Sequence, residues 1–105
     1  MNWLIMNDFR KKTLNLNSRV RHRKVGNEGV VVCMHNGNVI IVNEMGAYIV
    51  DQLKEPQTFG CMVSAITSQY EVTEQQAEED LQAYLVVLNE QQVLVAQSDS
   101  QEQRS

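Results

Sequence analysis

The chain has 105 residues, of which 43% are hydrophobic and 21% are charged. This length fits a single domain, and the hydrophobic fraction is large enough for a core, which excludes a chain that is disordered throughout. No hydrophobic run approaches the roughly 18 residues of a membrane span, and the first residues lack the basic start of a secretory signal. The two cysteines make no disulfide framework, so we expect a cytoplasmic protein without a membrane partner.

Charge is unevenly divided along the chain. Residues 1–24 carry seven of the nine Lys and Arg residues and one acid, a net charge of +6. Residues 25–105 carry two basic and twelve acidic residues, a net charge of −10. Such asymmetry is typical either of a chain with a charged partner or of a solvated basic arm, and both interpretations stay open at this point.

Residues 1–18 have no clear hydrophobic period and predict a basic N-terminal arm. Its hydrophobic residues crowd near the start of the chain: Trp3, Leu4, Ile5, Met6 and Phe9. An exposed cluster of this kind is a liability for a monomer. We therefore expect one short helical or extended piece of the arm to dock on the rest of the chain.

Residues 20–43 predict three strands joined by short turns. The expected strands are 20–25, 29–35 and 38–43. Gly26 and Gly29 indicate the first turn, because glycine accepts positive φ. The pair Asn36-Gly37 predicts a hairpin, because the preferred turn needs positive φ at both central residues. The result is an antiparallel meander with the second strand in the middle.

Three helices are predicted after the strands, at about 44–54, 58–70 and 74–91. Asn43, Thr58 and Thr73 are expected N-caps, because their side-chain oxygens can accept hydrogen bonds from free N–H groups of the first turn. Thr73 and Gln76 form a capping-box pattern. The last helix has a hydrophobic stripe at helical spacing: Ala77, Leu81, Tyr84, Leu85 and Leu88.

This order of elements predicts an α+β domain that is winged-helix-like, a three-stranded antiparallel meander followed by three helices on one face of the sheet. We expect the domain to cover residues 19–96. The hydrophobic run 93–95 should dock on it. Residues 97–105 contain no hydrophobic residue and predict a disordered tail.

The sequence indicates no enzymatic chemistry. The two histidines and two cysteines do not form the tight ligand pairs of zinc sites. There is no nucleophile elbow and no phosphate-binding loop. Glu78, Glu79 and Asp80 are consecutive on a helix, so they point in different directions and cannot act as a facing acid–base pair. We expect a non-catalytic chain without a metal or a cofactor.

A winged-helix protein that binds nucleic acid is one alternative function. Its last helix would lie against phosphates and should carry Lys or Arg. The predicted helix 74–91 has neither, and it holds five acids: Glu74, Glu78, Glu79, Asp80 and Glu90. DNA reading by this helix is therefore disfavoured, and the basic arm leaves open only a nonspecific contact with nucleic acid.

The third predicted strand forms an unprotected edge of the sheet. The run Val39-Ile40-Ile41-Val42 is hydrophobic on both faces and has neither charge nor proline, whereas the opposite edge strand carries Arg21, Arg23 and Lys24. Such an edge favours strand addition by an extended peptide. Burial by the last helix and the arm, or pairing with a second copy in a structural homodimer, are the alternatives.

Several segments resemble the PqqD family. Residues 42–53 (VNEMGAYIVDQL) resemble its L-N-x-T-G/A-A-x-I-L segment, residues 66–72 (ITSQYEV) its L-x-x-x-Y-x-V, and residues 79–88 (EDLQAYLVVL) its x-D-V-x-x-F-L-x-x-L. Gln92 stands where the family usually has Gly, and Lys54-Glu55-Pro56 replaces its frequent Asp-Gly. The similarity spans about residues 18–95.

This resemblance implies a RiPP recognition element, a non-catalytic peptide chaperone. Such a domain binds the leader of a ribosomally synthesised precursor peptide by strand addition and presents it to a modifying enzyme, frequently a radical-SAM protein. The pathway is PQQ-type or another RiPP biosynthesis, and a lasso-peptide pathway is one of the alternatives.

In the family the leader adds to the third strand and lies toward the last helix. The peptide-binding residues that the resemblance implies are Val39, Ile40, Ile41, Val42, Asn43, Asp80, Ala83, Tyr84 and Val87. Tyr84 also fits the core, whereas Val87 lies off the hydrophobic stripe of its helix. The acidic character of this helix predicts a peptide that carries Lys or Arg on that side.

Overall fold

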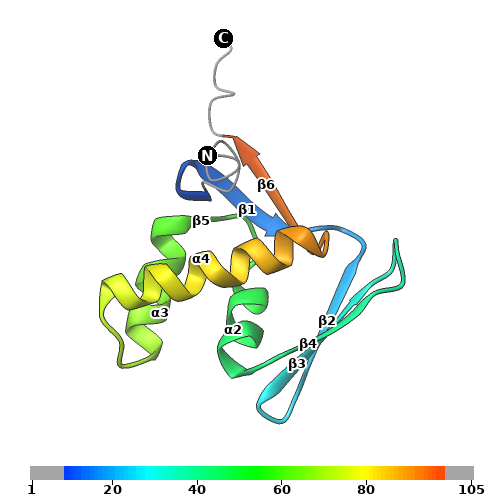
Figure 1. The fold of residues 1–105 in the computed structure, drawn as a ribbon, viewed down its shortest axis with the longest axis horizontal. Coiled ribbons are helices and arrows are strands. Elements are labelled where there is room, and N and C mark those ends of the chain that lie inside the picture. Colours follow the sequence, from blue (N-terminus) through cyan, green and yellow to red (C-terminus); the bar gives the residue numbers. More distant parts are fainter. Residues whose placement is uncertain (1–8, 99–105) are drawn as a thin grey trace.

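The computed structural model describes residues 9–98, so Trp3 and its hydrophobic neighbours, and residues 99–105 of the expected tail, lie outside the described range (Figure 1). The elements are η1 (Phe9–Lys11), β1 (Lys12–Leu16), β2 (Val20–Val25), β3 (Glu28–Cys33), β4 (Val39–Val42), α2 (Glu44–Gln52), β5 (Gln57–Thr58), α3 (Phe59–Gln69), α4 (Glu74–Glu90) and β6 (Leu94–Ser98). The predicted α+β class, an antiparallel three-stranded sheet followed by three helices, is confirmed.

The meander β2-β3-β4 forms the larger sheet, with β3 in the middle. Val31 of β3 lies between His22 of β2 and Ile40 of β4, which fixes the register of both antiparallel pairs. Strand β3 ends two residues earlier than predicted. The carbonyl oxygen of Cys33 already accepts hydrogen bonds from the N–H groups of Asn36 (3.3 Å) and Gly37 (2.8 Å), and these close the turn.

A second small sheet, in the order β5-β1-β6, was absent from the predictions. Leu14, at the centre of β1, is completely buried and pairs with Gln57 on one side and Ala96 on the other. The segment predicted as an arm therefore contributes a middle strand. Strand β6 continues to Ser98, two residues into the segment predicted as a tail. The expected docking of residues 93–95 is confirmed in Val93 and Leu94, which are buried.

Each helix begins at the cap that the sequence predicted. The caps are Asn43 for α2, Thr58 for α3 and Thr73 for α4, and their side-chain oxygens accept from the N–H groups of Gly46, Cys61 and Gln76. The reciprocal half of the capping box is absent at Thr73. Instead, the Gln76 amide donates to the Asp80 carboxylate at 2.9 Å, one turn further along α4.

Helix α4 ends in a left-handed turn at Gln92, which has φ of 65°. The N–H of Val93 donates to the Leu88 carbonyl at 2.9 Å, and the N–H of Gln92 donates to the Asn89 carbonyl at 3.1 Å. These are the two hydrogen bonds of a Schellman motif, a helix C-terminus in which the residue with positive φ is usually glycine. The departure from the family pattern at Gln92 thus falls on a residue with positive φ.

The core lies between the helices and the inner face of the larger sheet, which packs against α2 (Figure 1). Its completely buried side chains include Val31, Cys33, Ile49, Val50, Leu81, Leu85 and Leu88. Because side chains alternate along a strand, the opposite face of this sheet points away from the helices. None of the helices in residues 9–98 has the length and hydrophobicity required to cross a bilayer.

A candidate peptide groove between strand β4 and helix α4

Strand β4 is an open edge within residues 9–98, since it pairs with β3 alone. The N–H of Cys33 donates to the Asn38 carbonyl at 2.8 Å, so this opposed pair is hydrogen-bonded. Hydrogen-bonded and non-bonded pairs alternate in an antiparallel ladder. The main-chain groups of Ile40 therefore face β3, whereas those of Val39 and Ile41 face the open edge.

The side chains of β4 divide between two faces. Val42 is buried and Ile40 is half-buried against the core, whereas Val39 is 60% exposed and Ile41 is 59% exposed. The described part of the arm does not cover this strand, because β1 pairs with β5 and β6 instead. Within residues 9–98 the edge of β4 is therefore available, and residues 1–8 of the predicted arm lie outside the described range.

A groove of about 350 Å³ separates the end of β4 from α4. Its lining is mostly aliphatic and consists of Ile41, Val42, Asn43, Ala83, Tyr84, Val87 and Leu88. We call it the β4–α4 groove. Val87 is 47% exposed on its wall, in keeping with its place off the hydrophobic stripe. The groove offers an apolar surface directly beside unpaired main-chain groups.

The Tyr84 side chain joins the two walls of the groove. Its hydroxyl donates a hydrogen bond to the Asn43 side-chain oxygen. Burial raises the pKa of Tyr84 above its ordinary value of 10.0, so the hydroxyl keeps its proton at neutral pH and remains a donor. The ring fits here because residue 46 is glycine: a Cβ atom on Gly46 would lie 2.7 Å from Tyr84 Cε1 and 2.8 Å from Val42 Cβ.

A smaller hollow of about 260 Å³ adjoins the groove and contains Asp80. It is lined by Asn43, Met45, Asp80, Ala83 and Tyr84, three of which also line the β4–α4 groove. Asp80 is half-buried, and its carboxylate accepts the hydrogen bond from Gln76. One negative charge thus stands beside the apolar groove.

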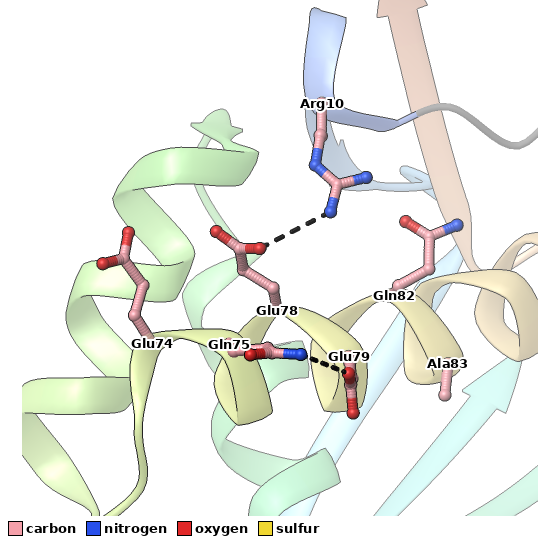
Figure 2. A pocket seen from close by; sticks show the side chains of 7 residues that line it. All are labelled: Arg10, Glu74, Gln75, Glu78, Glu79, Gln82 and Ala83. Carbon is pink, nitrogen blue, oxygen red and sulfur yellow. Dashed lines mark hydrogen bonds and ion pairs between the residues drawn. The ribbon is translucent and has the colours of Figure 1, made fainter.

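A wider hollow lies on the neighbouring face of α4 and is mostly polar, with three glutamates and one arginine in its lining (Figure 2). Glu78 forms an ion pair with Arg10 at 3.6 Å, and Glu79 accepts a hydrogen bond from the Gln75 amide at 3.4 Å. Ala83 lines both this hollow and the β4–α4 groove. The two surfaces are therefore continuous along α4.

The structure brings six of the nine predicted residues together in the β4–α4 groove: Ile41, Val42, Asn43, Ala83, Tyr84 and Val87. Asp80 lies in the adjoining hollow. Val39 and Ile40 line neither, and they can contribute only through their place on the open strand. The groove also contains Leu88 and the hollow contains Met45, which were not among the predicted site residues. Leu88 belongs to the hydrophobic stripe of the predicted helix 74–91, and such a stripe is typical of the core.

No group of three or more potential metal ligands is assembled anywhere in residues 9–98. Cys33 is a buried free thiol, and burial raises its pKa. Cys61 is free and exposed on α3. The chemistry of the groove is therefore that of main-chain hydrogen bonding, apolar contact and one flanking carboxylate.

A sequence profile of the family described as Coenzyme PQQ synthesis protein D (PqqD) matches residues 28–94. This chain belongs to the PqqD family. The match runs from the first residue of β3 to the first residue of β6, so the family region contains both walls of the groove. A comparison with curated proteins gave no match.

Two solved structures share the fold of this PqqD-family chain. "TbiB1 in Complex with the TbiA(beta) Leader Peptide" has a TM-score of 0.70 and 24% sequence identity, and the alignment covers 76% of this chain and 93% of that chain. "Lasso peptide synthetase B1 complexed with the leader peptide" has a TM-score of 0.67 and 23% identity, with coverage of 78% and 96%. Both of these similar chains were solved with a leader peptide bound.

Proposed function

We propose that this chain is a RiPP recognition element that binds the leader of a ribosomally synthesised precursor peptide and presents it to a modifying enzyme. The observation that carries the proposal is the open edge of β4 beside the apolar β4–α4 groove. Membership of the PqqD family and the leader-bound state of the two similar structures support it. The chain itself has no catalytic role in this proposal.

Binding begins with strand addition. The outward N–H and C=O groups of Val39 and Ile41 form main-chain hydrogen bonds with an extended leader, which becomes the fourth strand of the sheet. Every second side chain of the leader then points toward α4. An aliphatic side chain that enters the groove contacts Val87 and Leu88, and its burial contributes about 1.5–3 kcal/mol.

The flanking charge selects among leaders. Asp80 and the acidic face of α4 lie where the leader leaves the groove, next to Ala83. A leader with Lys or Arg at this place gains a favourable electrostatic contact, and an acidic leader is repelled. The preference concerns the side of the leader that faces α4.

Presentation follows from holding the leader. A core peptide that is continuous with a bound leader remains close to the enzyme that binds this chain, so its effective concentration there rises. The enzyme is a radical-SAM protein in a PQQ-type pathway. In a lasso-type pathway it is a peptidase-like protein, and the adjacent reading frames distinguish the two.

The proposal is tested with proline substitutions at the two edges of the larger sheet. Ile41→Pro removes an outward N–H from β4, and we expect the affinity for a dye-labelled synthetic leader of the neighbouring precursor gene to fall by at least about tenfold. Lys24→Pro is the matched control. On the opposite edge of the sheet, the Met34 N–H donates to the Arg19 carbonyl at 2.8 Å, so these two residues form a hydrogen-bonded pair. Because hydrogen-bonded and non-bonded pairs alternate along the ladder, the Lys24 N–H points outward, away from β3.

Fluorescence anisotropy measures both affinities, and circular dichroism verifies that both variants are folded. Equal leader affinity in the two folded variants would show that β4 is not the binding edge.

A further inference from the structure

The larger sheet has a second face that no helix of residues 9–98 covers (Figure 1). We call it the outer sheet face. The register places its residues in rows across the strands: Arg21 beside Val32 and Val39, and Arg23 beside Val30 and Ile41. Arg19 and Met34 continue the pattern, since the N–H of Met34 donates to the Arg19 carbonyl at 2.8 Å.

Two of the three columns on this face are hydrophobic. Val25, Met34, Val39 and Ile41 are each between 55% and 62% exposed, and they are four of the five large hydrophobic side chains that are strongly exposed within residues 9–98. Isolated exposed hydrophobic residues are ordinary, but their concentration on one face is typical of an interaction surface. The outer sheet face therefore has an apolar centre.

The third column begins at Arg19, just before β2, continues through the two arginines of β2 and ends at Val25. Arg19, Arg21 and Arg23 are all exposed, and none of them forms an ion pair with a carboxylate in the part of the chain that the structure describes. The Arg21 guanidinium donates only to main-chain carbonyls, those of Ser18 and Val20. Three unneutralised guanidinium groups thus border the apolar centre, and the acid on this face, Glu28, lies at the far end opposite Val25.

We propose that the outer sheet face docks the peptide-modifying enzyme, through a surface of that enzyme with an apolar centre and carboxylates along the side that meets β2. Carboxylates fit the arginine column, because the guanidinium fork pairs with them in a bidentate manner. A nucleic acid fits poorly, since hydrophobic columns occupy most of the face. Aliphatic contact with a charged border is the usual composition of a protein–protein interface.

This surface is continuous with the proposed peptide site. A leader that adds to β4 extends the same sheet, so every second leader side chain joins the outer face next to Val39 and Ile41. An enzyme docked on this face contacts the recognition element and the leader together. The contact between the docked enzyme and the leader rests on the proposed function, whereas docking of the enzyme on the outer sheet face does not require a bound leader.

Two neighbouring charge reversals on β2 test the proposal. Arg23→Glu reverses a charge on the outer face, and Lys24→Glu reverses one on the inner face of the same strand, with the same change in net charge. The probe is the modifying enzyme encoded beside this chain, titrated onto the full chain by calorimetry. We expect the enzyme affinity to fall on the order of tenfold in Arg23→Glu, with a loss that shrinks at high salt, and to stay near the original value in Lys24→Glu.

Leader affinity is measured in parallel with the labelled leader. Unchanged leader binding in Arg23→Glu with weakened enzyme binding supports the docking surface. Equal enzyme affinity in the two variants overturns it without affecting the proposed function. No enzyme binding at all also overturns it, and it removes the presentation step of the proposed function while leader capture by β4 stands. Sedimentation that shows self-association through this face, or a shift with double-stranded DNA that Arg23→Glu abolishes, also overturns it.

Discussion

The Tyr84 hydroxyl donates to the same Asn43 oxygen that accepts the N–H of Gly46 and caps helix α2. One side-chain oxygen therefore connects the last helix with the end of β4 and the start of α2. Both residues line the β4–α4 groove, so this contact links its two walls. The side-chain oxygen of Asn43 thus both caps helix α2 and holds Tyr84 in the groove.

Removing the hydroxyl should affect both stability and binding. In Tyr84→Phe we expect the free energy of unfolding in urea to fall by about 1 kcal/mol, the usual net contribution of one hydrogen bond, and leader affinity to fall several-fold. Tyr48→Phe is the control, because its hydroxyl donates to the Ala65 carbonyl away from the groove. It should lower stability similarly and leave the leader affinity unchanged. A loss of affinity in both variants would contradict the assignment.

The close packing at Gly46 gives a second prediction. The Cβ atom of Gly46→Ala would overlap the Tyr84 ring and Val42, so we expect a destabilisation of about 1–3 kcal/mol together with weaker leader binding. Gly60→Ala is the comparison, since a Cβ atom on Gly60 in α3 meets nothing within 4 Å. There the better helix propensity of alanine should leave the protein as stable or more stable. Urea denaturation distinguishes the two outcomes.

The left-handed residue at the end of α4 predicts a stabilising change. Gln92 has positive φ, which is strained for a side-chain-bearing residue and free of strain for glycine. We expect Gln92→Gly to raise the free energy of unfolding by about 0.5–1 kcal/mol. Gln91→Gly, at φ of −88°, gains no such relief and should be neutral or destabilising. A lower denaturation midpoint for Gln92→Gly would refute the argument.

The charge of Asp80 should control which leaders bind. Reversing it in Asp80→Lys replaces an attraction of up to about 1 kcal/mol by a similar repulsion, so we expect a basic leader to bind about tenfold more weakly at low salt. The difference should diminish at high salt. Glu71→Lys, outside the groove, is the control for net charge. Identical affinities of Asp80→Lys and the original chain at low salt would remove the electrostatic part of the proposal.

His22 should make stability depend on pH. Its ring nitrogens have no hydrogen-bond partner within residues 9–98. Burial lowers the pKa of His22 below its ordinary value of 6.5, Lys54 and Lys24 act in the same direction, and Asp51 opposes them. The unfolded chain therefore binds this proton more readily, and stability that is present above pH 6.5 is lost as the pH falls below it. Urea denaturation at several pH values should show a smaller acid loss in His22→Leu, and an equal loss would argue against this cause.

The open edge of β4 was predictable, because a strand that is hydrophobic on both faces and lacks charge is exceptional at a sheet margin. The caps at Asn43, Thr58 and Thr73 were predictable for a similar reason, since the chemistry of a cap resides in the residue itself. Strand β1 was not predictable. Its sequence, KTLNL, has one completely buried residue, Leu14, and its pairing with β6 joins positions about eighty residues apart.

The sequence also could not predict where the core ends and the groove begins. Leu88 follows the same helical stripe as Leu81 and Leu85, yet it is fully buried and also lines the β4–α4 groove. Helical spacing identifies the face on which a residue lies, but it does not say where along that face the packing opens. The ring of Tyr84 reaches Asn43 because Gly46 leaves room for it, and that contact depends on the fold.

The pairing of β1 with β6 sets Lys12 directly opposite Ser98. The two ends of the described range thus pair with each other in a sheet separate from the one that carries β4 (Figure 1). A covalent fusion to an enzyme at either end would be tethered at that sheet, leaving the β4 margin unobstructed. The same architecture can therefore work as a separate subunit or as a module within a larger polypeptide.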